Sequence, residues 1–444
     1  MLLYPPMDVL RLGPIGVTNT IWQQKTHEFP MAQQIKILVV GGGPAGMMAA
    51  IVAARRGAYV TLVERMPKVG KKLLATGAGQ CNLCNTKPTQ RNYHGNDTDF
   101  MMPALASFGA DTALTFFDAL GIEVREVEHG RVFPITGQAS NVLDVLRFEM
   151  SMLGIREVTD VKIQDVQTTD KGFLSISSGG EQFKSDKVVI AAGGTSSPNL
   201  GSNGGGYKIA SALGHTVTHT FPSRVPLVLD TWFLARLKGV KVRDAGISSF
   251  VDGELQRRSV GDLLFADYGI SGPPVLNVSR TIGEFERSDR ELSVAIDLFP
   301  EETMESMEAL IRKRIAHAPY KDLEVCLIGL LHKRLIPVLF AEAGQEDLKQ
   351  LCGNLDDGEV KRLVGILKDW RVPCSATKSW MNSQVTAGGV DVSEVDPLTM
   401  QSQLVPGLYF AGEVLDIDGD CGGYNLQWAW SSGYTAGTHA STQA

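Results

Sequence analysis

The chain has 444 residues, of which 43% are hydrophobic and 20% are charged. This composition is that of a globular protein and excludes an intrinsically disordered one, and the length predicts two or three domains. The net charge is −7 without a long run of Lys or Arg, which argues against a nucleic-acid partner and against an anionic membrane surface. The six cysteines do not make a disulfide framework in so long a chain, so we expect a reducing, cytoplasmic compartment.

The start of the chain contains no apolar stretch typical of a secretory signal, and we expect residues 1–31 to be a disordered N-terminal extension. Residues 37–54 then carry no charge over nearly the length of a membrane span. They contain four glycines and a proline, and a backbone broken in this way is not tolerated facing lipid. The stretch therefore predicts a strand, a tight loop and a helix, and no membrane segment.

The first regular elements follow in that order. Residues 35–40 are a short apolar run that predicts a buried parallel strand. After a glycine loop, Pro44 stands where the first residue of a helix tolerates proline, and the helix is expected to end near Arg56. Residues 59–63 predict the next strand, so residues 35–64 have the length and order of one strand–helix–strand unit.

The junction of this strand and helix carries the pattern Gly41-x-Gly43-x-x-Gly46. In such a pattern the first glycine makes the turn, the second lets the backbone approach a diphosphate, and the third lets the helix pack on the strand. Glu64 ends the next strand, where a carboxylate accepts hydrogen bonds from ribose hydroxyls. A merely tight turn would leave Glu64 unexplained. The pattern therefore predicts a dinucleotide site, and the carboxylate disfavours NADP because it would repel a 2′-phosphate.

Further along the chain, hydrophobic periodicity predicts helices at 111–121 and 139–153 and strands at 124–127, 155–167, 172–177 and 183–190. After about residue 221 the sequence pattern changes to strand-like and then helical stretches. Glycine-rich strands and loops return after Cys374. The simplest architecture is one nucleotide-binding domain built from both ends of the chain, with an insertion. We expect its parts at 32–221 and 373–444 and the insertion at 222–372, β-rich over 222–299 and helical over 300–372.

The C-terminal segment bears on which dinucleotide is bound. Residues 408–413 predict a buried strand that ends in Ala-Gly-Glu, and the glycines of residues 419–423 precede a helix that begins near Asn425. A simple NAD dehydrogenase has no use for a second glycine loop so late in the chain, whereas in FAD proteins such a strand and helix approach the flavin. A turn-rich C-terminus is the alternative that this segment leaves open. We predict an α/β fold with a Rossmann-like FAD-binding domain of the two-dinucleotide-binding-domain flavoprotein type and an inserted β-rich plus helical domain.

Seven stretches of the chain resemble the BaiN/RdsA-type, or HI0933-like, family of bacterial NAD(P)/FAD-dependent oxidoreductases. The most specific is Pro406–Gly433, and together the stretches span nearly the whole chain from Lys36. The other six are Val39–Ala50, Gly70–Asn85, Gly130–Pro134, Ala191–Tyr207, Asp262–Pro273 and Val385–Val390. The resemblance implies a split FAD domain with an inserted part, in agreement with the boundaries above.

The resemblance also implies which residues contact non-covalently bound FAD. These are Gly41, Gly43, Ala45, Gly46, Glu64, Arg65, Lys71, Lys72, Gly77, Asn82, Val161, Gly193, Gly412, Glu413, Asn425 and Leu426. Two positions depart from the family pattern, which often has Arg where Gln80 stands and commonly Thr where Cys84 stands. The first departure removes a charged contact, and the second creates the pair Cys81-x-x-Cys84.

The Cys81-x-x-Cys84 pair has two interpretations. It is a redox dithiol if it lies beside the flavin, or a pair of packed thiols, which the family context favours. We expect no zinc or other metal site, because no second Cys-x-x-Cys or paired-histidine motif accompanies it. The catalytic residue stays unassigned, with Cys81, Arg131 and Tyr424 as the candidates.

These patterns predict an FAD-dependent oxidoreductase acting on a small organic substrate. The resemblance implies reduction of activated C=C bonds, as in bile-acid enones, or oxidation of small amino-ketones. NAD(P)H is expected only as a transient electron donor, because no second strand–glycine loop–helix unit follows in mid-chain. A flavin-binding redox sensor without turnover is the alternative. The net negative charge of the chain argues against a flavoenzyme that acts on tRNA. The sequence does not indicate an oligomeric state.

Overall fold

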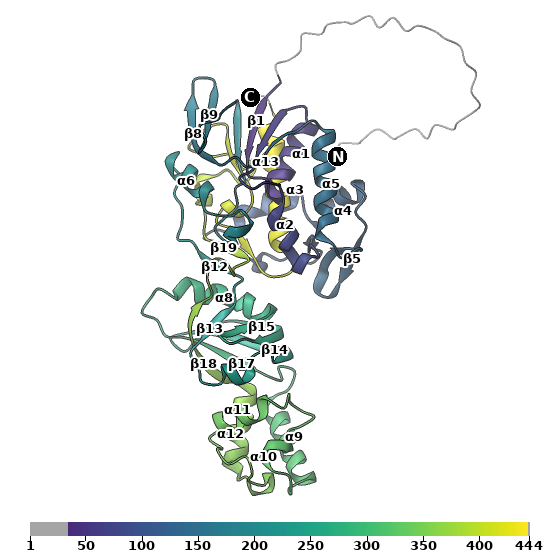
Figure 1. Ribbon diagram of the computed structural model, residues 1–444, viewed down its shortest axis with the longest axis vertical. Coiled ribbons are helices and arrows are strands. Elements are labelled where there is room, and N and C mark those ends of the chain that lie inside the picture. Colours follow the sequence, from purple (N-terminus) through teal and green to yellow (C-terminus); the bar gives the residue numbers. More distant parts are fainter. Residues whose placement is uncertain (1–33, 443–444) are drawn as a thin grey trace, which may run out of the picture. The chain divides into compact units, whose positions relative to one another are not determined.

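The structure is a computed structural model that describes residues 34–442, so the N-terminal extension expected at 1–31 lies outside the described residues. Residues from Ile35 onward form one compact unit by their contacts. Within it, two separate groups of buried apolar side chains define two cores, one around the parallel sheet and one in the inserted part. Figure 1 shows the elements of both.

The first core surrounds a five-stranded sheet in the order β20-β11-β1-β2-β7, with every neighbouring pair parallel. Its strands are β1 (Lys36–Val40), β2 (Tyr59–Val63), β7 (Arg156–Val158), β11 (Lys187–Ile190) and β20 (Leu408–Phe410). β1, α1 (Pro44–Arg55) and β2 form the predicted strand–helix–strand unit, which is confirmed. Because β20 comes from near the C-terminus and pairs with β11, both ends of the chain build this sheet.

The long C-terminal helix α13 (Tyr424–Ala440) packs directly against α1. A Cβ atom at Gly433 would lie 2.4 Å from the Ala45 carbonyl oxygen, and one at Gly437 would lie 2.5 Å from the Ala49 carbonyl oxygen. Only glycine permits so close an approach of the two backbones. This contact fixes the direction of α13 and therefore the place where its N-terminus lies.

The other elements of this region mostly follow the predictions. Helices were expected at 111–121 and 139–153, and they appear as α4 (Ala110–Ala119) and α5 (Ala139–Met152). The run 155–167 is divided into β7 and β8 (Ile163–Thr169), with Asp160 between them at a φ of 58°. The run 183–190 is likewise β10 (Gln182–Ser185), which pairs in a hairpin with β9 (Gly172–Ser177), and β11, which enters the parallel sheet.

Shorter elements complete this part of the molecule: α2 (Lys71–Ala75), β3 (Cys84–Asn85), β4 (Tyr93–His94), α3 (Met102–Ser107), β5 (Val124–Val127), β6 (Arg131–Pro134), α6 (Gly205–Ala212), β12 (Phe221–Ser223), β19 (Val385–Ala387) and β21 (Asp418–Gly419). By length and apolar composition, one described stretch, Asp99–Ala119, passes as a candidate membrane span. It consists of short helices interrupted at Phe108 and Gly109, and 39% of its apolar window is buried inside the molecule.

The inserted part is a closed six-stranded barrel in the order β13-β16-β15-β14-β17-β18. Its strands are β13 (Leu227–Leu229), β14 (Lys241–Val251), β15 (Glu254–Phe265), β16 (Gly269–Ser271), β17 (Leu292–Asp297) and β18 (Trp370–Thr377). Trp370 is fully buried, with its ring centroid 4.5 Å from that of Phe233. Because β18 closes the barrel, the expected boundary at residue 373 falls inside a barrel strand.

The helical segment is itself inserted into the barrel. Helices α9 (Met304–His317), α10 (Leu323–Cys326), α11 (Leu335–Glu342) and α12 (Asp357–Lys368) all lie between β17 and β18 in the chain. The β-rich and helical parts are therefore not consecutive blocks. A further helix, α8 (Pro273–Phe285), follows β16, and α7 (Leu234–Leu237) follows β13.

Candidate functional site

The glycine loop between β1 and α1 has one crowded side and one open side. A Cβ atom at Gly41 would lie 2.5 Å from the Ala191 carbonyl oxygen, and one at Gly46 would lie 1.9 Å from the Gly41 carbonyl oxygen. At Gly43, by contrast, no heavy atom of the described chain beyond the adjoining residues lies within 4 Å of such a Cβ. Gly43 is also the residue that precedes α1, whose N-terminus carries partial positive charge and N–H groups without helical acceptors. The open side of the loop therefore fits a diphosphate.

Glu64 lies at the carboxyl end of β2 beside this loop. Its carboxylate accepts hydrogen bonds from the Gly42 N–H at 2.7 Å and the Met66 N–H at 2.8 Å. The carboxylate lines a cleft together with Arg65 and Val161. Each carboxylate oxygen can accept more than one hydrogen bond, so acceptor sites remain for ribose hydroxyls. The cleft lies next to the diphosphate cradle, where the adenosine half of a dinucleotide would bind.

Two hydrogen bonds to backbone carbonyl oxygens hold the walls of this cleft. The Arg65 guanidinium donates to the Gly201 carbonyl oxygen at 3.0 Å, and the Val161 N–H donates to the Glu64 carbonyl oxygen at 3.1 Å. Gly193, at a φ of 66°, follows β11 on the same edge of the sheet. The sequence-predicted contacts for the nucleotide half of the cofactor are thus brought together.

A second group of predicted residues meets where β20 ends. Lys72 from α2 and Glu413 form an ion pair with 2.6 Å between Nζ and Oε2. The other carboxylate oxygen of Glu413 accepts a hydrogen bond from the Thr386 N–H at 2.7 Å. The preceding Gly412 has a φ of 78°, and a Cβ there would lie 2.7 Å from the Cβ of Ala45. Lys71 begins α2 next to Lys72.

The loop that leads into α13 is shaped by two asparagine side chains. The Asn82 amide oxygen accepts from the Gly423 N–H at 3.1 Å, and its NH₂ group donates to the Cys84 carbonyl oxygen. The Asn425 side chain accepts from the Gly419 N–H and donates to the Gly419 carbonyl oxygen, both at 2.8 Å. Asn425 therefore holds the loop with its side chain, and its backbone N–H in the first helical turn is the group available to a ligand.

Gly77 and Leu426 support the same loop. A Cβ at Gly77 would lie 3.0 Å from the Asn82 nitrogen, so glycine lets the 76–79 turn approach it, and Leu426 is buried in the first turn of α13. The N-terminus of α13, with its partial positive charge, is therefore preorganised to face an anionic or electron-rich group.

The catalytic candidates lie in different surroundings. Cys81 is fully buried and Cys84 is 1% exposed, and burial raises the pKa of each thiol to about 12. Tyr424 is buried, with its ring edge-to-face against Tyr93 at 5.8 Å. Arg131 on β6 is half-buried and donates to the Glu128 carbonyl oxygen at 3.2 Å. The two thiols thus have the surroundings of packed core residues.

We expect iodoacetamide to leave Cys81 and Cys84 unmodified in the native protein at pH 8. With a pKa of about 12, only about one ten-thousandth of each thiol is thiolate at that pH, and neither sulfur is accessible to reagent. Mass spectrometry of the labelled peptides checks this, with the urea-unfolded protein as the control in which both residues react. Fast labelling of Cys81 in the native protein would support the dithiol interpretation instead.

One charged cluster was not anticipated from the sequence. Arg224, Arg257 and His94 all contact the same carboxylate oxygen of Asp420, at 2.7, 2.6 and 2.9 Å. Burial alone would raise the pKa of Asp420, but the hydrogen bond from His94 and the two guanidinium charges lower it overall. Asp420 lies two residues before Gly422 and Gly423, which lead into α13, so this cluster ties the barrel strand β15, which carries Arg257, to the loop at the site.

The acidic residues of this cluster could be recognised in the sequence. Asp418 and Asp420 flank Gly419 within the most specific of the family-like stretches, and Arg280 from α8 also pairs with Asp418 at 3.1 Å. The cationic partners stand far away in the chain, and no local pattern marks them. In the residues that the structure describes, no group of His, Cys, Asp or Glu side chains is arranged to hold a metal ion.

We expect Glu64→Ala to weaken FAD binding by about 1.5–3 kcal/mol, equivalent to about a 10- to 150-fold rise in the dissociation constant. The substitution removes the charged acceptor that we assign to the ribose hydroxyls. Titration of the apoprotein with FAD measures the change, and Glu157→Ala, an exposed carboxylate on β7, serves as the matched control. Unchanged FAD occupancy of Glu64→Ala at low free FAD would contradict the assignment.

The nucleotide cradle at α1 and the second helix N-terminus at α13 fit the cofactor of an FAD-dependent oxidoreductase with a Rossmann-like domain. A family model described as the HI0933-like protein Rossmann domain matches residues 35–439. The chain belongs to this HI0933-like family, and the sequence-based resemblance is confirmed.

Named relatives cover the chain almost completely. The 3-dehydro-bile acid delta(4,6)-reductase of Clostridium scindens is 35% identical over 91% of this chain and 98% of its own length. The ribosomal RNA dihydrouridine synthase of Escherichia coli is 33% identical over 90% of this chain and 97% of its own length. Among solved structures, a flavocytochrome c3 fumarate reductase covers 92% of this chain and 78% of its own, with 17% identity and a TM-score of 0.46.

Proposed function

We propose that this protein is a cytoplasmic enzyme that reduces a carbon–carbon double bond conjugated to a carbonyl group. The observation that carries this proposal is the chemistry shared by the two named relatives. A 3-dehydro-delta(4,6) bile acid has double bonds conjugated to its 3-ketone, and the uracil ring reduced to dihydrouracil has its double bond conjugated to a ring carbonyl. Both names describe addition of two hydrogens across such a bond, although the molecules differ widely in size.

Non-covalently bound FAD would supply the hydride, and NAD(P)H would reload it as a transient donor. The chain contributes the cradle at Gly43 for the diphosphate and Glu64 for the ribose. The ion pair of Lys72 with Glu413 and the N-terminus of α13 border the remaining part of the site. A helix N-terminus at that position stabilises negative charge and therefore favours the reduced, electron-rich state of the cofactor.

Two substrate classes are compatible with this chemistry. A small organic enone matches the expectation from the sequence and the Clostridium relative. A uridine in RNA is the second candidate, favoured by the E. coli relative. Oxidation of an amino-ketone, and a redox-sensing role without turnover, are the outcomes that would contradict the proposal.

The test is an anaerobic half-reaction. The purified holoenzyme is reduced with NADH or NADPH and mixed with a 3-oxo-delta(4) steroid, a protein-free ribosomal RNA fragment, or buffer alone, while flavin absorbance is followed. We expect oxygen-independent reoxidation by the enone or the RNA and a product two hydrogens heavier. In a separate aerobic assay with aminoacetone as substrate, turnover of aminoacetone alone would replace the proposal by amino-ketone oxidation, and no turnover in either assay would favour the sensor.

A further inference from the structure

The inserted part holds the loop before α13 at two adjacent residues. The Arg257 guanidinium on β15 donates to the Asp420 carboxylate at 2.6 Å. A second contact runs through α8, where the Asn277 side chain accepts from the Cys421 N–H and donates to the Ser259 hydroxyl, both at 3.1 Å. Arg257 and Ser259 stand two residues apart on β15 and therefore lie on the same face of the strand. One face of a barrel strand thus fixes Asp420 and Cys421.

The loop passes this constraint on to the first turn of α13. The Asn425 side-chain amide donates to the carbonyl oxygen of Gly419 at 2.8 Å and to that of Asp420 at 3.3 Å. Asn425 also carries the backbone N–H that we predict to face the cofactor. A displacement of Asp420 is therefore transmitted to this N–H through a single side chain.

Charges of both signs surround the loop. Carboxyl groups occupy alternate positions of residues 416–420, and the cationic or titratable side chains that face them come from three other segments: Asp416, Asp418, Asp420, Arg224, Arg257, Arg280 and His94. Burial raises the pKa of Asp416, and Arg280 pairs with Asp418 and with the exposed Glu284. Removal of Arg257 lowers the charge beside the N-terminus of α13 by one and leaves Asp420 with Arg224 and His94.

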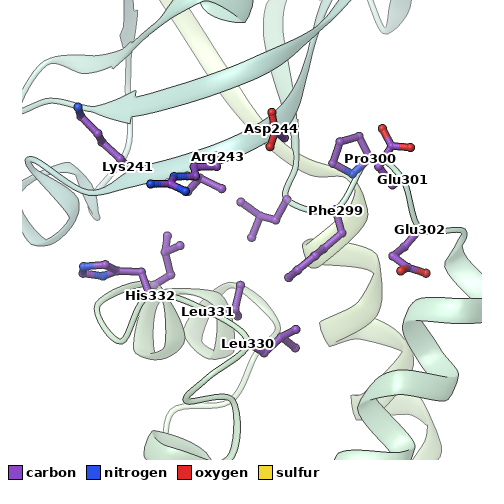
Figure 2. Close-up of a pocket in the computed structure, with 13 residues that line it drawn as sticks. Lys241, Arg243, Asp244, Phe299, Pro300, Glu301, Glu302, Leu330, Leu331 and His332 are labelled. Carbon is purple, nitrogen blue, oxygen red and sulfur yellow. The ribbon is translucent and has the colours of Figure 1, made fainter.

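The main cavity of the inserted part lies away from this contact. It has a volume of about 400 Å³ and is situated between the start of β14 and the loop before α11. Figure 2 shows charged side chains of both signs along it, Lys241 among them. In the antiparallel pair of β14 and β15, Lys241 stands opposite Leu264, whereas Arg257 stands opposite Ser249. The cavity and the Arg257 contact are therefore at opposite ends of this strand pair.

We propose that Arg257 and Asn277 are positioning residues through which the inserted barrel fixes the N-terminus of α13 against the flavin and raises the reduction potential of the bound FAD. A fixed helix N-terminus with a compensated Asp420 favours the electron-rich reduced flavin, whereas an uncompensated carboxylate beside it disfavours that state. The proposal rests on FAD as the cofactor of the site, and it is independent of the substrate. It gives the inserted part a role in the electron chemistry.

The test measures the midpoint potential of the flavin in the holoenzyme, by anaerobic reduction in equilibrium with a reference dye. Arg257→Gln removes the charge and its contacts, and Asn277→Ala removes the second contact at constant charge. The matched control is Arg258→Gln, because Arg258 is the next residue of β15, is exposed, and pairs with Asp297 at 3.0 Å. Lys241→Gln at the cavity is a second control. FAD content and melting temperature of each protein establish that it is folded.

We expect Arg257→Gln to lower the equilibrium constant for two-electron reduction of the flavin about tenfold, equivalent to a potential lower by about 30 mV. Asn277→Ala should lower this constant about threefold, because the loop loosens while the charge stays. Both controls should remain within about twofold of the unchanged protein. Arg257→Lys keeps the charge but not the forked contact with Asp420 and His94, so its potential should lie between those of Arg257→Gln and the unchanged protein.

Equal potentials of Arg257→Gln and Arg258→Gln would overturn the proposal. A lower melting temperature or weaker FAD binding without a change in potential would overturn it as well, since the contacts would then serve stability alone. If Arg257→Gln does not retain FAD, Asn277→Ala and Arg257→Lys decide the question, and unchanged potentials of both contradict the proposal.

This proposal and the proposed function fail in different ways. If the potential responds to none of these variants but the reduced holoenzyme is reoxidised by the enone or the RNA, the positioning role fails and the proposed function stands. If the potential shifts as expected but neither acceptor reoxidises the reduced enzyme, the positioning role stands and the proposed function fails.

Discussion

Replacing Arg224 with methionine is expected to lower the free energy of unfolding by about 3–5 kcal/mol. Arg224 is fully buried, and its guanidinium donates to Asp420 at 2.7 Å, to the Gly419 carbonyl oxygen at 2.9 Å, and to two carbonyl oxygens of α8 at 3.2 Å. Methionine fills part of the volume but leaves these acceptors without their buried donor. Removing one partner of a buried charged pair costs more than the pair contributes, because the remaining charge stays desolvated.

Urea denaturation measures this change, with Arg312→Met as the control. Arg312 forms surface ion pairs with Glu308 and Asp357, and its side chain is 40% exposed, so its loss should cost no more than about 1 kcal/mol. Because Arg224 also holds Gly419 and Asp420, we expect Arg224→Met to lose FAD more readily as well. A stability within about 1 kcal/mol of that of Arg312→Met would show that the cluster contributes little.

Alanine at Gly46 and alanine at Gly43 are both expected to weaken FAD binding, but only alanine at Gly46 is expected to destabilise the fold. At Gly46 the new Cβ would lie 1.9 Å from the Gly41 carbonyl oxygen, so the turn between β1 and α1 must shift. Overpacking of this kind costs about 1–3 kcal/mol or more, and the cradle is lost with the turn. We expect Gly46→Ala to retain almost no FAD and to be markedly destabilised.

At Gly43 the backbone has a φ of −78°, which alanine adopts freely, and the described chain leaves the Cβ position open. The apoprotein should therefore keep its stability within about 0.5 kcal/mol. The methyl group nevertheless occupies the cradle, and loss of one charge-assisted hydrogen bond to the diphosphate corresponds to about a 10- to 150-fold weaker affinity for FAD. Flavin absorbance per protein and urea denaturation of the apoproteins separate the two variants. Full FAD binding by Gly43→Ala would place the diphosphate elsewhere.

The catalytic group and the substrate pocket were the parts of the site that sequence patterns did not predict. Cys81 was a candidate on the spacing Cys81-x-x-Cys84, yet both sulfurs lie in the core behind the loop that Asn82 holds. Spacing reports proximity along the chain but not exposure, which depends on the elements that cover the residue. Asn425 was expected as a cofactor contact, and this stays a prediction: its side chain bonds the backbone of Gly419, which leaves its backbone N–H for the cofactor.

The nucleotide half of this protein could be predicted from sequence patterns alone. The strand, the glycine loop, the helix and Glu64 lie within some thirty residues, and local sterics and hydrogen bonding specify each of them. The closure of the barrel by β18 and the convergence of Arg224 and Arg257 on Asp420 could be seen only in the folded structure. These contacts join residues far apart in the chain. The packing of the two cores sets the geometry of these contacts, and no local sequence pattern predicts it.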